Sequence, residues 1–157
     1  MQEPTVTHST FVIEKSYAAG PERVFAAFAD PARKRKWYGE SAGRDVLEYS
    51  SDFRVGGSER TLSKFKEGTP FPGATLTAES TFLDIVEKRR IVFAYTMSMD
   101  GRRFSTSLAT VELLPTAKGT DLIFTDQSAF FEGSDGAQMR EAGWRKLLDN
   151  LGNELGQ

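Results

Sequence analysis

Cysteine is absent from this chain, and histidine occurs only once, at His8. Without a thiol the chain cannot form disulfides, a thiolate nucleophile or a cysteine-ligated zinc or iron–sulfur site. A single histidine cannot supply a multi-histidine metal centre. We therefore expect no metal site and no cofactor. Any catalysis would have to use carboxylates, Arg, Lys, Tyr or hydroxyl groups.

Long apolar runs are lacking as well. One of the longest, residues 91–95, is far shorter than the about 20 residues that a membrane-spanning helix needs. Residues 1–5 have neither the basic start nor the apolar stretch of a signal peptide. The 20 Lys and Arg nearly balance the 22 Asp and Glu, which leaves a net charge of -2. These features predict a cytoplasmic protein without a membrane span.

Common catalytic motifs are missing too. The chain has no phosphate-binding Walker loop and no G-x-G-x-x-G, and the segment nearest to a nucleophile elbow, 56–60, ends in Arg60 where glycine is required. The residues alone therefore name no reaction. A length of 157 residues with 39% hydrophobic content fits one domain with a sizeable core. We expect a single domain over 1–157, with residues 1–8 as a loose N-terminal tail.

The first part of the chain has a strand pattern followed by helix starts. Apolar residues alternate with polar ones over 11–17, which predicts a strand. The Gly-Pro pair at 20–21 and the Asp-Pro pair at 30–31 are typical helix starts, because proline is preferred at the first helical position. Two short helices are therefore predicted, and the second carries the chain to Trp37.

Residues 45–127 have the composition of strands separated by turns. Asp100-Gly101 predicts a type I′ hairpin, because both residues tolerate the positive φ that this turn requires. Links of this length can join only antiparallel strands. Gly56-Gly57 predicts a bend or bulge that lets a strand curl.

The C-terminal segment predicts an amphipathic helix of about five turns. Asp135 and Gln138 have the spacing of a capping box, and Gly143 is expected to allow close packing of the helix on the sheet. The apolar stripe consists of Trp144, Leu147, Leu148, Leu151 and Leu155. Such a stripe has to pack on the sheet. The predicted fold class is therefore α+β, with a curved antiparallel sheet wrapped around one long C-terminal helix.

In this order, the segments of the chain resemble those of START-like, birch-pollen-allergen-like (SRPBCC) domains. Among these, the chain is most similar to the branch named after the C-terminal domain of the activator of the 90-kDa heat-shock-protein ATPase. The resemblance lies in FVIEK (11–15), AGPERVFAAF (19–28), DP (30–31), WY (37–38), DFRVGG (52–57), RIVF (90–93), GTDL (119–122) and GW before three leucines (143–151). It implies a helix-grip fold with a cavity between sheet and helix. Family members bind lipids, hormones or polyketides there, some catalyse cyclisation or dehydration, and others engage the chaperone.

Aromatic and sulfur-containing side chains are the candidates for the cavity wall. Each of them could equally be ordinary core, but as a set they suit an apolar pocket, and methionine suits an adaptable one. The predicted ligand-binding residues are Trp37, Tyr38, Phe53, Phe65, Phe82, Phe93, Tyr95, Met97, Met139 and Trp144, together with Arg60. Phe71, Phe104 and Phe124 belong to the same wider cluster.

Polar residues within the strands are the next candidates: Arg60, Glu79, Tyr95 and Gln127. Strands that are apolar on both faces do not reveal which of these side chains point inward. Glu79, if it pointed into an apolar cavity, would have a raised pKa and could act as a general acid or base. It is the one catalytic candidate, and it forms no recognisable constellation with Tyr95, Arg60 or Asp126.

The basic run of residues 33–36 precedes Trp37 and Tyr38. Basic residues beside aromatic ones could bind nucleic acid. Four consecutive charges cannot share one helix face, however, and the whole chain is acidic. We interpret the run as a solvated helix surface and expect no nucleic-acid partner.

Three functional hypotheses remain. The first is a module that binds a small apolar or amphipathic ligand between the sheet and the C-terminal helix. The second is a polyketide cyclase or dehydratase-like enzyme. The third is a stress-related protein that modulates a heat-shock chaperone. The sequence leaves open the ligand, any reaction, and whether the chain forms a homodimer.

Overall fold

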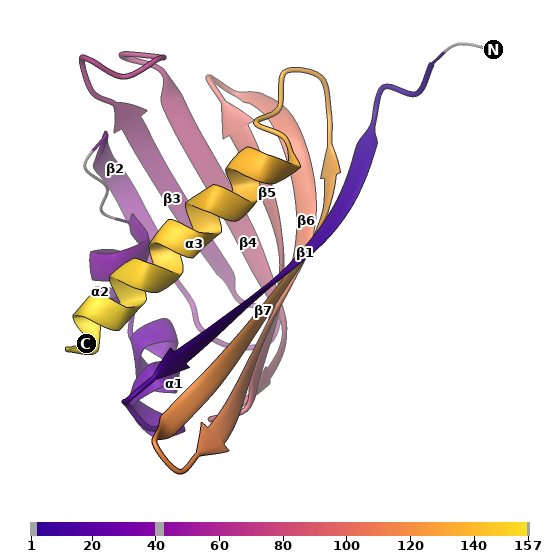
Figure 1. Cartoon of the computed structure of the whole chain (residues 1–157). Helices are drawn as coiled ribbons and strands as arrows, with labels where there is room; N and C mark the ends of the chain where they lie inside the picture. The colour runs from indigo at the N-terminus through magenta and orange to yellow at the C-terminus, as the bar shows by residue number, and fades with distance from the viewer. Residues whose placement is uncertain (1–2, 40–42, 157) are drawn as a thin grey trace.

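A computed structural model describes residues 3–39 and 43–156. Over these residues, a curved antiparallel sheet of seven strands wraps around one long helix (Figure 1). The strands, in sheet order, are β1 (Thr7–Tyr17), β7 (Gly119–Phe130), β6 (Arg102–Thr116), β5 (Arg90–Met99), β4 (Thr75–Val86), β3 (Ser58–Phe65) and β2 (Arg44–Ser51). The helices are α1 (Pro21–Ala29), α2 (Pro31–Lys34), the π-helical η1 (Arg35–Gly39) and α3 (Ala137–Glu154). The fold is the predicted α+β helix-grip fold.

The first strand is longer than its apolar pattern indicates. β1 begins at Thr7, and both Thr7 and His8 pair with β7, opposite Phe130 and Ala129. The expectation of a loose tail over residues 1–8 is therefore wrong for its last two residues. Backbone pairing holds them in the sheet although their side chains are exposed. Residues 1–2 lie outside the described residues.

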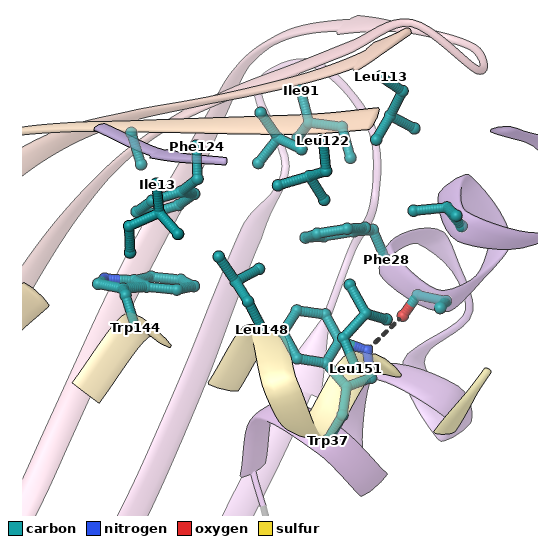
Figure 2. Packing of buried hydrophobic residues seen from close by; sticks show 14 of the residues in the cluster. Ile13, Phe28, Trp37, Ile91, Leu113, Leu122, Phe124, Trp144, Leu148 and Leu151 are labelled. Atoms are coloured by element: carbon teal, nitrogen blue, oxygen red, sulfur yellow. Dashed lines mark hydrogen bonds between the residues drawn. The ribbon is translucent and has the colours of Figure 1, made fainter. Parts of the chain in front are cut away.

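The two helix starts are confirmed. Gly20 is the N-cap of α1 with Pro21 following it, and the Asp30 carboxylate caps α2 by accepting a hydrogen bond from the Ala32 amide at 3.0 Å. After α2 the backbone widens into η1, which brings Trp37 into the core. The Trp37 indole then donates a hydrogen bond to the Ala27 carbonyl at 2.9 Å (Figure 2).

The turn predictions had mixed outcomes. The type I′ hairpin is confirmed, since Asp100 and Gly101 both have positive φ, at 50° and 80°. Gly56 and Gly57 do not bend a strand but form the turn between β2 and β3. A Cβ on Gly57 would lie 2.0 Å from the Asp52 carbonyl oxygen, so only glycine fits this turn. The strand irregularities that accompany the curvature lie elsewhere, between Val46 and Glu48, Phe82 and Asp84, and Met97 and Ser98.

The start of α3 differs from the predicted capping box. Its N-cap is Gly136, with φ at 84°, and no side chain caps the helix. Asp135 instead uses both carboxylate oxygens to accept hydrogen bonds from Arg140. A buried guanidinium is a stronger partner for a carboxylate than a neutral backbone amide.

The core lies between the concave face of the sheet and α3. Figure 2 shows Trp144 of the helix facing Ile13 and Phe124 of the sheet, and Leu148 and Leu151 of the helix belong to the same core. The rings of Trp144 and Phe124 are 4.2 Å apart between centroids, and the two leucines and Ile13 have no exposed surface. Burial of each such side chain contributes about 1.5–3 kcal/mol to the stability of the fold.

The helix approaches the sheet closely at Gly152 and not, as expected, at Gly143. A Cβ on Gly152 would lie 3.3 Å from the ring of Tyr17, whose hydroxyl donates a hydrogen bond to the Leu148 carbonyl at 2.7 Å. A Cβ on Gly143 would have no neighbour within 4 Å. The C-terminal half of α3 is therefore tightly packed, and space remains beside Gly143. None of the described helices is long and apolar enough to cross a membrane.

The basic run is only partly a solvated surface. Arg33, Arg35 and Lys36 are exposed, but Lys34 is only 4% exposed. Its ammonium group donates a hydrogen bond to the buried Glu59 carboxylate at 2.7 Å. The same group lies over three aromatic rings, those of Tyr38, Phe82 and Phe93, at 4.7, 5.7 and 5.6 Å from their centroids. The pair joins α2 to the concave face of β3.

Removal of one partner of this pair should destabilise the protein strongly. Lys34→Met leaves the Glu59 carboxylate buried without its cation, and we expect a loss of about 3–5 kcal/mol in the free energy of unfolding. The double variant Lys34→Met/Glu59→Leu should recover much of this loss, because no charge is then left unpaired. Urea unfolding at neutral pH measures both, with the exposed Lys36→Met as control. A single variant as stable as this control would contradict the prediction.

Candidate ligand-binding site

A cavity of about 370 Å³ opens between α3 and the concave face of the sheet, beside Gly143. Strands β3, β4 and β5 form one wall, and α3 forms the other. The volume is near the lower end of the about 300–1,000 Å³ that is typical of small-molecule sites. Most of the surface is apolar and is contributed by Phe65, Leu76, Ala78, Met97, Trp144 and Leu147.

A first group of polar side chains lies on the β2–β3 side of the cavity. Arg44 begins β2, and its guanidinium donates a hydrogen bond to the Ser63 hydroxyl at 3.3 Å and lies 5.9 Å from the centre of the Phe65 ring. Burial lowers the pKa of Arg44 from its ordinary value. The hydroxyl of Thr61 is buried and has no hydrogen-bond partner among the described residues. This side therefore presents donors that the described residues leave unused.

Tyr38 lines the same side and comes from η1. Burial raises the pKa of its phenol, and the negative charge of Glu59 raises it further. Arg44 and Arg140 act in the opposite direction but more weakly. Tyr38 therefore keeps its proton at neutral pH and presents a neutral hydroxyl rather than a base.

A second polar group is built around Arg140 of α3, which is only 5% exposed. Its guanidinium donates to both oxygens of Asp135, at 2.9 and 3.0 Å, and to the hydroxyls of Ser105, Ser107 and Tyr95, at 2.7, 3.2 and 3.2 Å. An arginine side chain has five N–H groups. All of them are used here, so Arg140 fastens the start of α3 to β5 and β6.

The Tyr95 hydroxyl connects this group to a buried carboxylate. It accepts hydrogen bonds from Arg140 at 3.2 Å and from the Trp144 indole at 3.1 Å, and it donates to Asp126 at 2.5 Å. Asp126 has no exposed surface and also accepts a hydrogen bond from the Ser128 hydroxyl. Burial raises the pKa of Asp126, although the hydrogen bonds from Ser128 and Tyr95 oppose this. Burial, together with the charge of Asp126, raises the pKa of Tyr95 to about 12.

This network has little capacity for acid–base chemistry in the cavity. The Tyr95 proton is directed at Asp126, and the N–H groups of Arg140 are all occupied. Asp126 is fully buried and does not line the cavity. Among residues 3–39 and 43–156, no group of three or more His, Asp or Glu side chains could hold a metal ion. The network is therefore structural: it connects α3 to the sheet beside the open cavity.

The structure brings part of the predicted ligand-binding set together. The residues that line the cavity are Tyr38, Phe65, Tyr95, Met97, Met139 and Trp144. Four others are not in its wall but in the core beneath it: Trp37, Phe53, Phe82 and Phe93. Their rings contact one another and the wall residues, as Phe93 does with Tyr95 at 5.8 Å between centroids. The alternative of ordinary core thus fits these four. Phe71 is exposed.

The charged strand candidates lie on the opposite face of the sheet. Arg60 pairs there with Glu48 at 2.7 Å and with Glu79 at 3.5 Å, and Gln127 is exposed. Arg60 does not line the cavity, and Glu79 is exposed rather than inward, so neither has the placement that its predicted role assumed. In β3 the concave positions are Glu59, Thr61 and Ser63, and the pairing places Glu79 opposite Arg60. Of the four polar strand candidates, only Tyr95 points inward.

Sequence reasoning missed Arg44, Thr61 and Arg140 and gave Asp126 no defined place. A signal existed for Arg140, since it precedes Trp144 by four residues and therefore continues the apolar stripe of α3. No such signal marks Thr61, because its neighbours along β3 on the same face are also polar.

Loss of the Tyr95 hydroxyl should destabilise the fold. Tyr95→Phe removes a donor from Asp126 and an acceptor from the Arg140 guanidinium and the Trp144 indole. Each buried polar group left unpaired costs about 1–3 kcal/mol. Tyr17→Phe is the matched control, because it removes a single hydrogen bond between a phenol and a carbonyl. Urea unfolding should show a clearly larger loss for Tyr95→Phe. Equal losses would mean that the network adds nothing beyond one bond.

The raised pKa of Asp126 predicts a pH effect with a definite sign. The folded protein holds this proton above the ordinary pKa of 3.8, so the wild type loses stability relative to Asp126→Asn as pH rises from that value through the folded pKa. Below 3.8 the difference should be constant. Unfolding free energies of both proteins from acid to neutral pH test this. A wild type that gains stability relative to the variant over this range would contradict the assigned direction.

Comparison with known proteins places this geometry in a family. The family described as Activator of Hsp90 ATPase homolog 1-like protein matches residues 18–156. A solved structure of a protein from Rhizobium loti is 46% identical, with a TM-score of 0.83 over 96% of this chain and 99% of that one. One from Rhizobium leguminosarum is 34% identical, with a TM-score of 0.89 over 96% of each chain.

A more distant structure shares the fold alone. It is the AHSA1-like protein from Aeromonas hydrophila, 22% identical, with a TM-score of 0.70 over 94% of this chain and 92% of that one. A search of the curated proteins found no match. The family match and the two Rhizobium structures agree with the resemblance seen in the sequence. The chain therefore belongs to the family of Activator of Hsp90 ATPase homolog 1-like proteins, within the START-like (SRPBCC) superfamily.

Proposed function

We propose that this protein binds a small amphipathic molecule in the cavity between α3 and the sheet. The observation that carries the proposal is the cavity itself, an apolar space of about 370 Å³ beside Gly143. The buried Thr61 hydroxyl supports it, because no described residue bonds to this group and native proteins seldom leave such groups unsatisfied.

The energetics favour a ligand with both apolar and polar parts. Each 100 Å² of apolar surface removed from water contributes about 2.5 kcal/mol. Association itself costs about 4–15 kcal/mol, so apolar burial in a cavity of this size would give only weak binding. Hydrogen bonds to the polar groups on the β2–β3 side supply the additional affinity and fix the orientation of the ligand.

The other hypotheses have less support. A cyclase or dehydratase needs an acid and a base in the cavity, but Glu79 lies on the outer face, and Tyr95 and Asp126 are bonded to each other. Modulation of a chaperone is suggested by the family description alone. A cavity filled by phenylalanine side chains would have favoured that function, whereas this cavity is open.

Filling the cavity from the helix should abolish binding without harming the fold. Gly143→Leu adds a side chain whose Cβ meets no atom within 4 Å apart from its own helix backbone and chain neighbours, and it should stabilise α3 by roughly 0.5–1 kcal/mol because glycine is a poor helix former. We expect the fluorescent neutral probe N-phenyl-1-naphthylamine to bind the wild type and to bind this variant at least about tenfold more weakly, which corresponds to about 1.4 kcal/mol.

The matched control is Ala142→Leu, which adds a leucine one position earlier, on an exposed part of α3 outside the cavity. This variant should bind the probe as the wild type does. Fluorescence titration gives the affinities, and thermal unfolding verifies that both variants fold. The proposal fails if the wild type does not bind the probe, or if Gly143→Leu binds it equally well.

A further inference from the structure

The charges around the cavity are not balanced. Among the described residues, its lining includes Arg44, Arg140 and Lys146 but only one carboxylate, that of Asp135. Asp135 is bonded through both oxygens to Arg140, so these two cancel. Lys146 is exposed at the mouth, and Arg44 is half-buried. The remaining charge of the lining is therefore positive, and the more deeply placed cation is Arg44.

Arg44 uses few of its donors. Among the described residues, no carboxylate lies within 4.0 Å of it, and its one side-chain hydrogen bond goes to the neutral Ser63 hydroxyl at 3.3 Å. Arg140, on the other side of the cavity, differs from Arg44 in this respect. It binds the Asp135 carboxylate through two parallel hydrogen bonds, and all of its N–H groups are in use. A guanidinium has this geometry ready for a carboxylate or a similar planar anion.

Thr61 provides a second donor in the same place. It is only 8% exposed, lines the cavity, and its hydroxyl has no partner among the described residues. Thr61 and Ser63 are on the same face of β3, about 7 Å apart along the strand. Because Arg44 lies against Ser63, a group bonded to the guanidinium can extend toward the Thr61 hydroxyl.

We propose that the natural ligand is a monocarboxylic acid whose carboxylate binds Arg44 and Thr61 and whose apolar body lies against Leu76, Met97 and Trp144. The inference rests on the proposed function of the cavity and adds the chemical class of the ligand. A single guanidinium and one hydroxyl suit one negative charge, whereas a phosphate monoester would require more cations. The apolar wall accepts an aliphatic or aromatic body.

An isosteric pair of probes tests the carboxylate. Both 2-naphthoate and 2-naphthamide have the same ring system and a planar head group, but only the first is charged. Each is used to displace N-phenyl-1-naphthylamine from the full chain. We expect 2-naphthoate to bind the wild type at least about tenfold more tightly, since charge-assisted hydrogen bonds are about twice as strong as neutral ones.

Substitutions at Arg44 and Thr61 locate this preference. Arg44→Gln should remove the preference for 2-naphthoate over 2-naphthamide, and Arg44→Lys should lose most of this preference because lysine lacks the paired donors. Thr61→Val should weaken 2-naphthoate and make the protein slightly more stable, because it removes an unsatisfied buried hydroxyl. Arg60→Gln, on the opposite face of β3, is the matched control and should change neither affinity.

The outcomes separate the two proposals. If the neutral probe binds but 2-naphthoate and 2-naphthamide compete equally, the carboxylate inference is overturned and the binding function stands. An undiminished preference in both Arg44 variants overturns the inference as well. If the wild type does not bind the neutral probe, the binding function fails, and the inference fails with it.

Discussion

The position of α3 on the sheet depends on one buried guanidinium, that of Arg140. The C-terminal half of the helix is in direct contact with β1, where Gly152 allows the Tyr17 ring to approach. At the N-terminal end the helix is connected to the sheet through the long side chain of Arg140 and its hydrogen bonds to Tyr95, Ser105 and other hydroxyls. The helix thus contacts the sheet directly at its C-terminal end and through a long polar side chain at its N-terminal end. The space that remains between helix and sheet is the cavity.

The same hydrogen-bond network around Arg140 determines which polar groups are available in the cavity. Because Arg140, Asp135 and Tyr95 satisfy one another, the side of the cavity near the start of α3 offers no free charge. On the β2–β3 side, the described residues give Arg44 only the neutral Ser63 hydroxyl and give the Thr61 hydroxyl no partner. The cavity is therefore polarised, with an apolar centre, a closed polar network on one side and available donors on the other.

The sequence predicted the fold better than the site, and particular residues show why. The Asp100-Gly101 hairpin, the Gly-Pro start of α1 and the apolar stripe of α3 are local signals, because backbone φ and helical spacing act over a few residues. The inward or outward direction of Arg60 and Glu79 depends on strand register, which is a long-range property. Lys34 was misplaced for the same kind of reason, since its buried partner Glu59 lies 25 positions away.

The buried charges of the protein follow a rule that gives Arg44 its significance. Lys34 is paired with Glu59, and Arg140 with Asp135. Asp126, which has no ion-pair partner among the described residues, is held by two hydroxyl donors and has a raised pKa that favours its neutral form. Both arrangements, the ion pair and the neutral carboxyl group, offset the cost of removing a charge from water. Arg44 is half-buried and has therefore lost part of its hydration, yet the described residues place no anion beside it. In this fold, an anion from outside the chain would complete the pattern.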